Sequence, residues 1–234
     1  MELLTVDAGN TSVDLGFWSG RKLVRVEKVP LKELGRLPVI KLKGLGVCVR
    51  PSLMPLLKEK LPLLRWVEHG TVPLKVRYEP PRSLGLDRLV NAYGFLKLFG
   101  PSGAVVSAGT ALVVDLVLNG VFEGGFITAG VRLKLEALSG RAELVPGLEP
   151  VEPPPVGRST REAAGGGAVK ESRLFVEGTV REWEKRFGLK LKVVVTGGDA
   201  ALFKGLGVLE PYLTLKALRL LQDELVAEAE QRGL

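Results

Sequence analysis

The stretch that decides the fold is Asp7-Ala8-Gly9-Asn10-Thr11, because a related stretch, Ser107-Ala108-Gly109-Thr110-Ala111, follows at an offset of 100 residues. Each stretch places a glycine turn between two runs that are rich in β-forming residues. When residues 7–20 are aligned with 107–120, the identities are Ala8/Ala108, Gly9/Gly109, Val13/Val113 and Gly20/Gly120. The matching turns and the matching flanking strands together predict an internal duplication.

The duplication predicts the fold class. Two similar α/β halves, each opening with a strand, a glycine turn and a strand, would close a cleft between them. In the actin-like ATPase and sugar kinase fold, one glycine turn from each half faces the phosphates of ATP. We therefore predict two ribonuclease H-like halves with an interdomain cleft. Residues 1–103 would carry the first phosphate loop and the substrate motif, and residues 104–234 the second phosphate loop and the Thr196-Gly197-Gly198 segment.

The composition narrows the classes of function. The 234 residues carry a net charge of +7, with 46% hydrophobic and 25% charged residues, as in soluble globular proteins. The positive residues are scattered, which argues against nucleic-acid binding and suits an enzyme with two anionic substrates. A single cysteine, Cys48, excludes an internal disulfide, and a single histidine, His69, excludes a Cys/His metal cluster. Without an apolar signal core or a membrane-length apolar run, we expect no membrane association and a cytoplasmic location.

The first glycine turn has chemistry that suits phosphate binding. A glycine between two strands lets backbone N–H groups approach phosphate oxygens, and Asn10 and Thr11 add side-chain donors. Asp7, at the end of a strand, can hold Mg²⁺ directly or through water. A plain hairpin turn explains the same residues equally well, so both interpretations stay open for this stretch and for its copy at 107–111.

Gly85-Leu86-Asp87-Arg88 is the second motif. Asp87 could accept the proton of an attacking hydroxyl, and Arg88 could bind a carboxylate through two hydrogen bonds. Aspartate is also a preferred N-cap residue, and the apolar spacing predicts a helix from this point. The local sequence therefore favours a structural cap over a catalytic role.

Three further segments carry glycine or polar signals. Thr196-Gly197-Gly198 follows a predicted buried strand, where α/β folds commonly leave room for a nucleotide. Gly124-Gly125 permits either close backbone packing or the approach of a ligand. Ser159 and Glu162 form a capping box that makes Thr160 a helix-start residue, although its hydroxyl could still face a ligand. The sequence contains no Walker A motif and no protein-kinase signature.

In this order and spacing, the motifs resemble those of the type III pantothenate kinases. The resemblance runs from Leu4 to about Leu221 and also includes Val47–Pro51, Asn91 and Asp115. It implies the fold of the acetate and sugar kinase, heat-shock ATPase and actin superfamily, and a homodimer. It further implies ATP-dependent phosphorylation of pantothenate to 4′-phosphopantothenate, the first step of coenzyme A biosynthesis.

The resemblance also implies a role for particular residues. Asp87 matches the proton acceptor of the family, which overrides the local preference for a cap, although one residue can serve both roles. Arg88, by its chemistry, would bind the carboxylate of pantothenate. The residues expected to bind ATP are Asp7, Ala8, Gly9, Asn10, Thr11, Ser12, Val13, Asp14, Thr110, Gly197 and Gly198, with Asp7 as the candidate for Mg²⁺. The residues expected to bind pantothenate are Tyr78, Gly85, Leu86, Asp87, Arg88 and Thr160.

The second half departs from the family pattern. Ser107 stands where the family normally has an aspartate that binds a monovalent cation such as K⁺ or NH₄⁺, and a hydroxyl is a weaker cation ligand. The resemblance therefore leaves the dependence on this cation open. Ala129 replaces a usual proline, and Leu112 and Val113 replace threonines, so this half-site is expected to be less polar.

Two other hypotheses remain at this point. Some members of the family have been described as similar to transcription activators, so the chain could be a catalytically weak or inactive paralogue that binds a ligand or regulates transcription. It could also be a kinase of the same fold that acts on another small alcohol, with the choice set by Tyr78, Arg88 and Thr160. The intact first loop and Asp87 favour an active pantothenate kinase.

Overall fold

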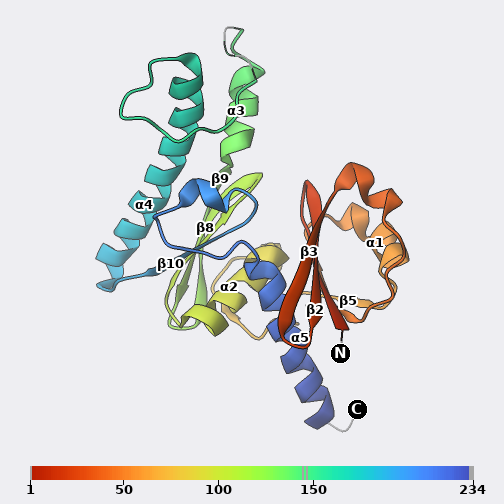
Figure 1. The fold of residues 1–234 in the computed structure, drawn as a ribbon. Coiled ribbons are helices and arrows are strands. Elements are labelled where there is room, and N and C mark those ends of the chain that lie inside the picture. The colour runs from red at the N-terminus through yellow and green to blue at the C-terminus, as the bar shows by residue number, and fades with distance from the viewer. Residues whose placement is uncertain (1, 144, 146, 232–234) are drawn as a thin grey trace. The chain divides into compact units, whose positions relative to one another are not determined.

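The computed structural model describes residues 2–143, 145 and 147–231, and it divides into two compact units. The first unit contains residues 1–99 and 213–234, and the second contains residues 100–212. Each unit holds a mixed sheet with helices packed against it, as Figure 1 shows. None of the described helices combines the length and the apolar character that a membrane crossing requires.

The sheet of the first unit has the strand order β3-β2-β1-β4-β5. Strand β1 pairs antiparallel with β2 and parallel with β4, β2 pairs antiparallel with β3, and β4 pairs parallel with β5. The strands are β1 (Glu2–Ala8), β2 (Ser12–Ser19), β3 (Lys22–Pro30), β4 (Gly44–Cys48) and β5 (Leu64–Trp66), and a two-residue strand, β6 (Lys75–Val76), follows later in the chain.

Alternation along β1 decides which side chains meet which layer. Leu4, Val6 and Ala8 are fully buried in one core with Leu57 of helix α1 (Met54–Lys60). The residues between them, among them Thr5 and Asp7, point to the opposite face, because successive side chains of a strand alternate. That face is covered by helix α5 (Leu213–Gln231), which contacts β1 and β4. Asp7 therefore faces α5.

Helices α2 (Leu86–Phe99) and α5 pack closely against each other in the first unit, and Figure 1 shows them side by side in yellow and blue. A Cβ atom at Gly94 of α2 would lie 2.6 Å from the Cβ of Ala217 in α5. The predicted division at residues 103 and 104 did not foresee this return of the chain, because the amphipathic pattern of 213–231 shows an apolar face but not the sheet that it covers.

The strands of the second unit lie in the order β9-β8-β7-β10-β11, which corresponds strand by strand to β3-β2-β1-β4-β5 of the first unit. Strand β7 pairs antiparallel with β8 and parallel with β10, so every pairing has its counterpart in the first unit. The strands are β7 (Gly103–Ala108), β8 (Ala111–Leu118), β9 (Val121–Ala129), β10 (Lys192–Thr196) and β11 (Val208–Leu209). The predicted fold class, with two ribonuclease H-like halves, is confirmed.

The internal repeat is real, but its alignment slips by one residue at the glycine turn. Ala8 pairs with Val13 in the first hairpin, whereas Ala108 pairs with Leu112 in the second. The second turn is therefore one residue shorter, and the offset falls from 100 in β1/β7 to 99 in β2/β8 and β3/β9. The predicted pairs Val13/Val113 and Gly20/Gly120 are not structural equivalents.

Two irregularities recur at the corrected offset. Gly20 has φ 58° and Asn119 has φ 52° at the next hairpin turn of each unit. The register between the second and third strands shifts between Phe17 and Trp18 in the first unit, and between Leu116 and Val117 in the second. A bulge at the same place in both copies supports the duplication more strongly than the sequence identities do.

The helices of the second unit cover the face of β7 that carries Ala104, Val106 and Ala108. They are α3 (Val131–Ser139) and the long α4 (Gly167–Phe187), which continues a π-helical turn at Arg161–Gly166. Ser107 lies between two of these core residues in β7, so it points to the opposite face, as Asp7 does in the first unit.

The close packing of α2 on α5 predicts an unusual outcome for a helical glycine. Replacing a glycine by alanine inside a helix normally stabilises it by up to about 1 kcal/mol. At Gly94 the new methyl group would press on Ala217, and overpacking costs about 1–3 kcal/mol. We expect Gly94→Ala to lower the free energy of unfolding, measured by urea denaturation.

Gly178→Ala is the matched control, because Gly178 lies inside α4 and its added Cβ would meet no atom within 4 Å. We expect this variant to be as stable as the parent or more stable. Equal stabilisation of both variants would contradict the close packing of α2 and α5.

Candidate functional site

The first glycine loop joins β1 to β2 and leaves its tip exposed. Asp7 and Ala8 end β1, Gly9–Thr11 form the turn, and Ser12–Asp14 begin β2. The N–H of Gly9 donates to the carbonyl of Ser12 at 3.0 Å, so this amide already closes the turn. The side chains of Asn10 and Thr11 are exposed, and they are the polar groups of the turn that a ligand can reach.

Two carboxylates of the first unit, Asp14 and Asp87, act on a third, Asp7. Asp7 pairs across the hairpin with Asp14. Burial, and then the negative charges of Asp87 and Asp14, raise the pKa of Asp7 from 3.8 to about 7, while Thr214 and Lys28 lower it by less. Burial also raises the pKa of Asp14 and of Asp87. Asp7 therefore favours a proton or a cation, because its burial and the two neighbouring charges disfavour its ionised form.

Asp87 occupies the second position of α2, where Gly85 leaves room for its carboxylate. A Cβ at Gly85 would lie 2.6 Å from Oδ1 of Asp87. Hydrogen bonds from the backbone N–H groups of Arg88 and Asp87, together with the Arg88 charge, partly offset the rise that burial causes in the Asp87 pKa. Asp87 is thus a first-turn residue and not the N-cap that the local sequence favours, because the helix already begins at Leu86.

Arg88 and Tyr78 contact each other beside Asp87. Arg88 is only 5% exposed, its Nη1 donates to the Tyr78 hydroxyl at 3.3 Å, and its guanidinium lies 5.2 Å from the centre of the Tyr78 ring. The segment between them is held by His69, whose Nε2 lies 2.8 Å from the Leu84 carbonyl oxygen. The structure therefore brings Tyr78, Gly85, Asp87 and Arg88 together.

In the second unit, three glycine segments meet at the turn Gly109-Thr110. A Cβ at Gly197 would collide with the carbonyl of Ala108, and one at Gly130 would collide with the carbonyl of Gly109. Gly197 has φ 95°, a conformation that favours glycine. A Cβ at Gly109 itself would meet no atom within 4 Å, so the turn faces open space. Thr110 and Gly198 are exposed there.

Thr160 immediately precedes the π-helical turn, and the predicted capping box places it. The N–H of Glu162 donates to Oγ of Ser159 at 3.2 Å, and the N–H of Arg158 donates to Oε2 of Glu162 at 2.8 Å. The return bond comes from Arg158 and not from Ser159, one residue earlier than in the standard box. The Thr160 side chain is exposed, and isolated π-turns are frequent at functional sites.

Ser107 takes the place of Asp7 in the second unit. Its cross-strand partner is Val113, where the first hairpin has the Asp7/Asp14 pair. The acid of this face is instead Asp115, which is 1% exposed and packs so close to Gly125 that a Cβ there would lie 2.5 Å from its Oδ1. Gly124-Gly125 thus serves close packing at its second glycine.

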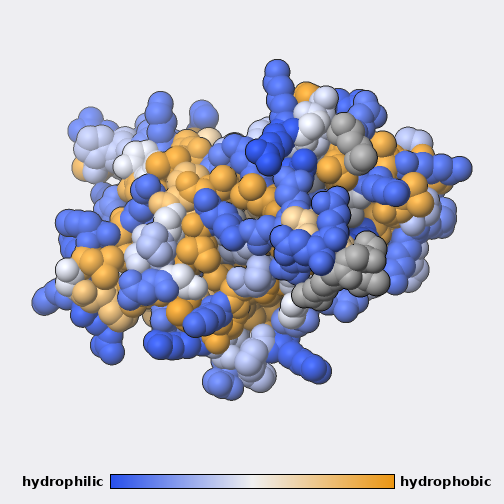
Figure 2. Space-filling view, turned by 90° about the horizontal axis from the view of Figure 1, so that it is seen from below, coloured by the Kyte–Doolittle hydropathy of each residue, from blue (hydrophilic) through white to orange (hydrophobic). Residues whose placement is uncertain are grey.

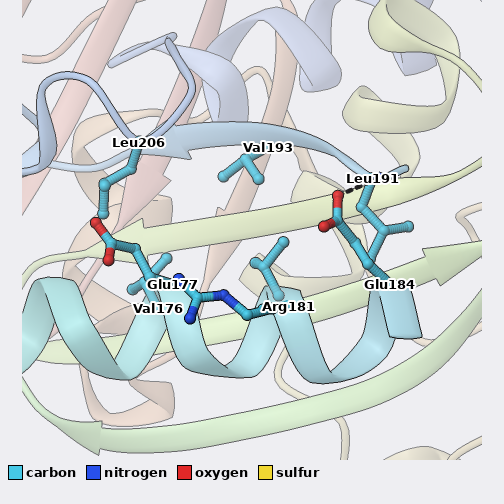
Figure 3. Close-up of a pocket in the computed structure, with 8 residues that line it drawn as sticks. Val176, Glu177, Arg181, Glu184, Leu191, Val193 and Leu206 are labelled. Carbon is cyan, nitrogen blue, oxygen red and sulfur yellow. Dashed lines mark hydrogen bonds between the residues drawn. The ribbon is translucent and has the colours of Figure 1, made fainter. Parts of the chain in front are cut away.

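A groove of about 280 Å³ also lies in the second unit, between α4 and the start of β10 (Figure 3). Figure 3 shows Glu184 of α4 accepting a hydrogen bond from the N–H of Leu191, at 3.0 Å. The groove borders the N-terminal end of β10, whereas Gly197 and Gly198 follow its C-terminal end. It is therefore separate from the predicted nucleotide-binding turn.

Asp7 is the predicted metal ligand. Among the described residues, no three or more His, Cys, Asp or Glu side chains gather in a way that could hold a metal ion. Mg²⁺ commonly keeps several waters and binds one or two carboxylates together with phosphate oxygens, so a single, partly buried aspartate suits it. The donors at Asp7 fit Mg²⁺ only in the company of a phosphate ligand.

The family of this chain follows from its similarity to known protein sequences. The profile of "Type III pantothenate kinase" matches residues 48–182. A type III pantothenate kinase of Aquifex aeolicus is 42% identical over 94% of this chain and 96% of its own length. The protein of that name from Moorella thermoacetica is 30% identical over 94% of this chain and 98% of its own length. This chain belongs to the type III pantothenate kinase family.

A solved structure supports the fold of this type III pantothenate kinase family member. The chain from Campylobacter jejuni, described as a conserved Baf family transcriptional activator, aligns with a TM-score of 0.71 and covers 96% of this chain and 100% of its own. The two sequences are 20% identical, so this likeness shows the fold alone.

The sequence did not single out every residue that touches these groups. Thr214 lies beside Asp7 and lowers the pKa of its carboxyl, and His69 was noted only as the lone histidine. Asn91 appeared in the resemblance without a role, and it accepts a hydrogen bond from Thr214. Thr214 and His69 act through tertiary contacts, and the helical spacing of 214–230 was the only available signal for Thr214.

The raised pKa of Asp7 predicts how stability depends on pH. The folded state holds a proton that the unfolded state releases above pH 4, so the free energy of unfolding falls as the pH rises from about 4 to about 7. We expect Asp7→Asn to remove this loss and to exceed the parent in stability at pH 8 by on the order of 2 kcal/mol. The two proteins should converge near pH 4.

Urea denaturation at pH 4 and pH 8, without nucleotide or Mg²⁺, measures this difference. Glu59→Gln, at an exposed carboxylate of α1, serves as the control and should follow the parent at both pH values. A difference between Asp7→Asn and the parent that does not change with pH would refute the unfavourable charge at Asp7.

Proposed function

We propose that this protein transfers the γ-phosphoryl group of ATP to the primary hydroxyl of pantothenate, giving 4′-phosphopantothenate in the first step of coenzyme A biosynthesis. Membership of a kinase family, with relatives that match nearly the whole chain, supports the reaction. The observation that supports the mechanism is the position of Asp87, where Gly85 leaves space for a carboxylate whose pKa is raised.

Asp87 is the proposed general base. Its pKa lies above the ordinary range because burial outweighs the hydrogen bonds and charge that favour ionisation, which brings it nearer to the working pH. As the hydroxyl of pantothenate attacks the γ-phosphorus, Asp87 accepts the proton of that hydroxyl. Its place in the first turn of α2 and its hydrogen bonds from backbone N–H groups hold the carboxylate in position before the reaction.

Arg88 is the proposed partner of the pantothenate carboxylate. Its guanidinium is held by the ring and hydroxyl of Tyr78, so little side-chain freedom is lost when a carboxylate binds. Gly85 and Leu86 would border the substrate beside Asp87, and the exposed hydroxyl of Thr160 is the remaining proposed substrate contact. An adjacent Arg and Asp suit a substrate that carries both a carboxylate and an alcohol.

The two glycine turns are proposed to bind ATP. Residues 7–14 offer the exposed side chains of Asn10 and Thr11, and Thr110, Gly197 and Gly198 border the second turn. Asp7 would hold Mg²⁺, and the ion when bound neutralises phosphate charge during the transfer. A cation beside Asp7 would also offset the repulsion from Asp14 and Asp87.

Further expectations follow from the proposed reaction. Ser107 supplies a hydroxyl and no carboxylate, so we assign no step to a monovalent cation. We propose a cytoplasmic enzyme, because the reaction consumes ATP, and a homodimer, for which exposed apolar side chains are available. Figure 2 shows that hydrophobic residues reach the surface in several places between hydrophilic ones. The regulatory paralogue is not favoured, since curated relatives that are 42% and 30% identical are named as kinases.

Asp87→Asn tests the proposed reaction. The substitution keeps the shape of the side chain but removes the base, and general base catalysis contributes about 10²–10⁴-fold. We expect kcat to fall by that factor, with KM for pantothenate changed by less than about threefold. The measurement is formation of 4′-phosphopantothenate from pantothenate, ATP and Mg²⁺, followed by mass spectrometry.

Glu68→Gln, at an exposed acid of the same unit, should retain the parental rate. Parallel reactions in potassium and sodium salts should give equal rates if Ser107 has removed the cation site. If the folded parent forms no product in either salt, the proposed function is wrong.

Gly85→Ala tests the space beside the base. The new methyl group would lie 2.6 Å from Oδ1 of Asp87 and push the carboxylate aside. Misplacement by about 1 Å can cost 10²-fold in rate, so we expect kcat to fall by about 10–100-fold with the melting temperature nearly unchanged. Gly35→Ala is the control, because its Cβ would meet no atom within 4 Å. A kcat for Gly85→Ala equal to that of the parent would contradict the proposed position of the Asp87 carboxylate.

A further inference from the structure

A buried hydrogen bond joins the two helices that cover the site face of the first sheet. Oγ1 of Thr214, in the first turn of α5, donates to Oδ1 of Asn91 in α2 at 2.9 Å. Asn91 is 5% exposed and Thr214 is 7% exposed, so water does not compete strongly for this bond. Losing one partner would remove a buried hydrogen bond between the two helices, which makes the bond costly to break.

Each partner of this bond is linked to one of the proposed site carboxylates. Asn91 lies four residues after Asp87 in α2, so both side chains project from the same face of that helix. The hydroxyl of Thr214 also lies close enough to Asp7, at the end of β1, to lower the pKa of that carboxyl. The path Asp87–α2–Asn91–Thr214–Asp7 thus connects the proposed base to the proposed Mg²⁺ ligand within one unit.

The surrounding packing keeps this path rigid. One turn further along each helix, Gly94 meets Ala217, and a Cβ at Gly94 would also lie 3.2 Å from Leu213. The two helices therefore have little freedom to slide, and the Asn91–Thr214 bond sets their register at the end nearest the carboxylates. A polar bond is directional, whereas the apolar contacts beside it tolerate small shifts.

We propose that Asn91 and Thr214 are positioning residues for phosphoryl transfer, which hold Asp87 and Asp7 at the separation that the reaction needs. This inference rests on the proposed function, because it assigns both residues to the kinase reaction. Neither residue needs to touch the substrates. Their effect passes through the placement of the two carboxylates.

Thr214→Val is the decisive variant, because it keeps the shape of the side chain and removes the hydroxyl. The matched control is Thr5→Val. Thr5 is 1% exposed, lies two residues before Asp7 in β1, and accepts a hydrogen bond from Nε1 of Trp18 at 2.8 Å. Both variants lose one buried hydroxyl of the same unit, but only Thr214 is bonded to Asn91.

We expect Thr214→Val to lower kcat by about 10–100-fold with KM for pantothenate within threefold of the parent, since misplacement affects the transition state most. Thr214→Ser should restore kcat to within threefold, because it restores the hydroxyl. Thr5→Val should keep kcat within about twofold while losing comparable thermal stability. The double variant Asn91→Leu/Thr214→Val should lose less than the product of the two single losses, because both changes break the same Asn91–Thr214 bond.

Binding of a non-hydrolysable ATP analogue, measured by calorimetry with and without Mg²⁺, separates this inference from the proposed function. We expect Thr214→Val to weaken the Mg²⁺-dependent binding by at least about fivefold, and Thr5→Val to leave it within twofold. If the parent fails to phosphorylate pantothenate, the function is wrong and this arm alone decides the inference. Equal losses in Thr214→Val and Thr5→Val, or multiplicative losses in the double variant, would overturn it.

Discussion

The close approach of α5 to α2 and β1 is the constraint on which the placement of Asp7 and Asp87 in the first unit depends. Gly94 and Ala217 leave no room for a larger side chain between α2 and α5. Helix α5 also covers the face of β1 that carries Thr5 and Asp7. The same packing fixes where α2 begins relative to the sheet, and hence where Asp87 stands. A strand that would otherwise present an aspartate to water therefore presents it to two helices.

This arrangement makes the electrostatic properties of the site a consequence of its packing. Burial is the largest cause of the raised pKa of Asp7, and the charges of Asp87 and Asp14 add to it. The cost of gathering three acids around the end of one strand lowers the stability of the empty protein at neutral pH. A cation bound beside Asp7 would recover part of that cost, because it would offset the negative charges of Asp14 and Asp87.

Local chemistry allowed much of this architecture to be predicted from the sequence. The glycine turns, the alternating strands, and helices opening at Asp87, near 131–138 and at 214–230 follow from turn residues and apolar spacing, and the structure has helices at 86–99, 131–139 and 213–231. The one-residue slip of the repeat could not be predicted, because Val13/Val113 and Gly20/Gly120 are identities that happen to fit the wrong offset. The bond between Thr214 and Asn91 was equally hidden, since no local pattern joins residues so far apart in the chain.

The corrected repeat explains how the two halves have divided their tasks. At equivalent places, Asp7 and Asp14 of the first hairpin correspond to Ser107 and Val113 of the second, while Gly16 corresponds to the buried Asp115. The acids that could handle a proton or a divalent cation thus belong to the first copy. The second copy keeps its glycine contacts at Gly130 and Gly197, where backbone atoms approach too closely for any side chain. Duplication supplied two similar turns, and the second has Ser107 and Val113 where the first has Asp7 and Asp14, so it offers backbone and hydroxyl groups in place of carboxylates.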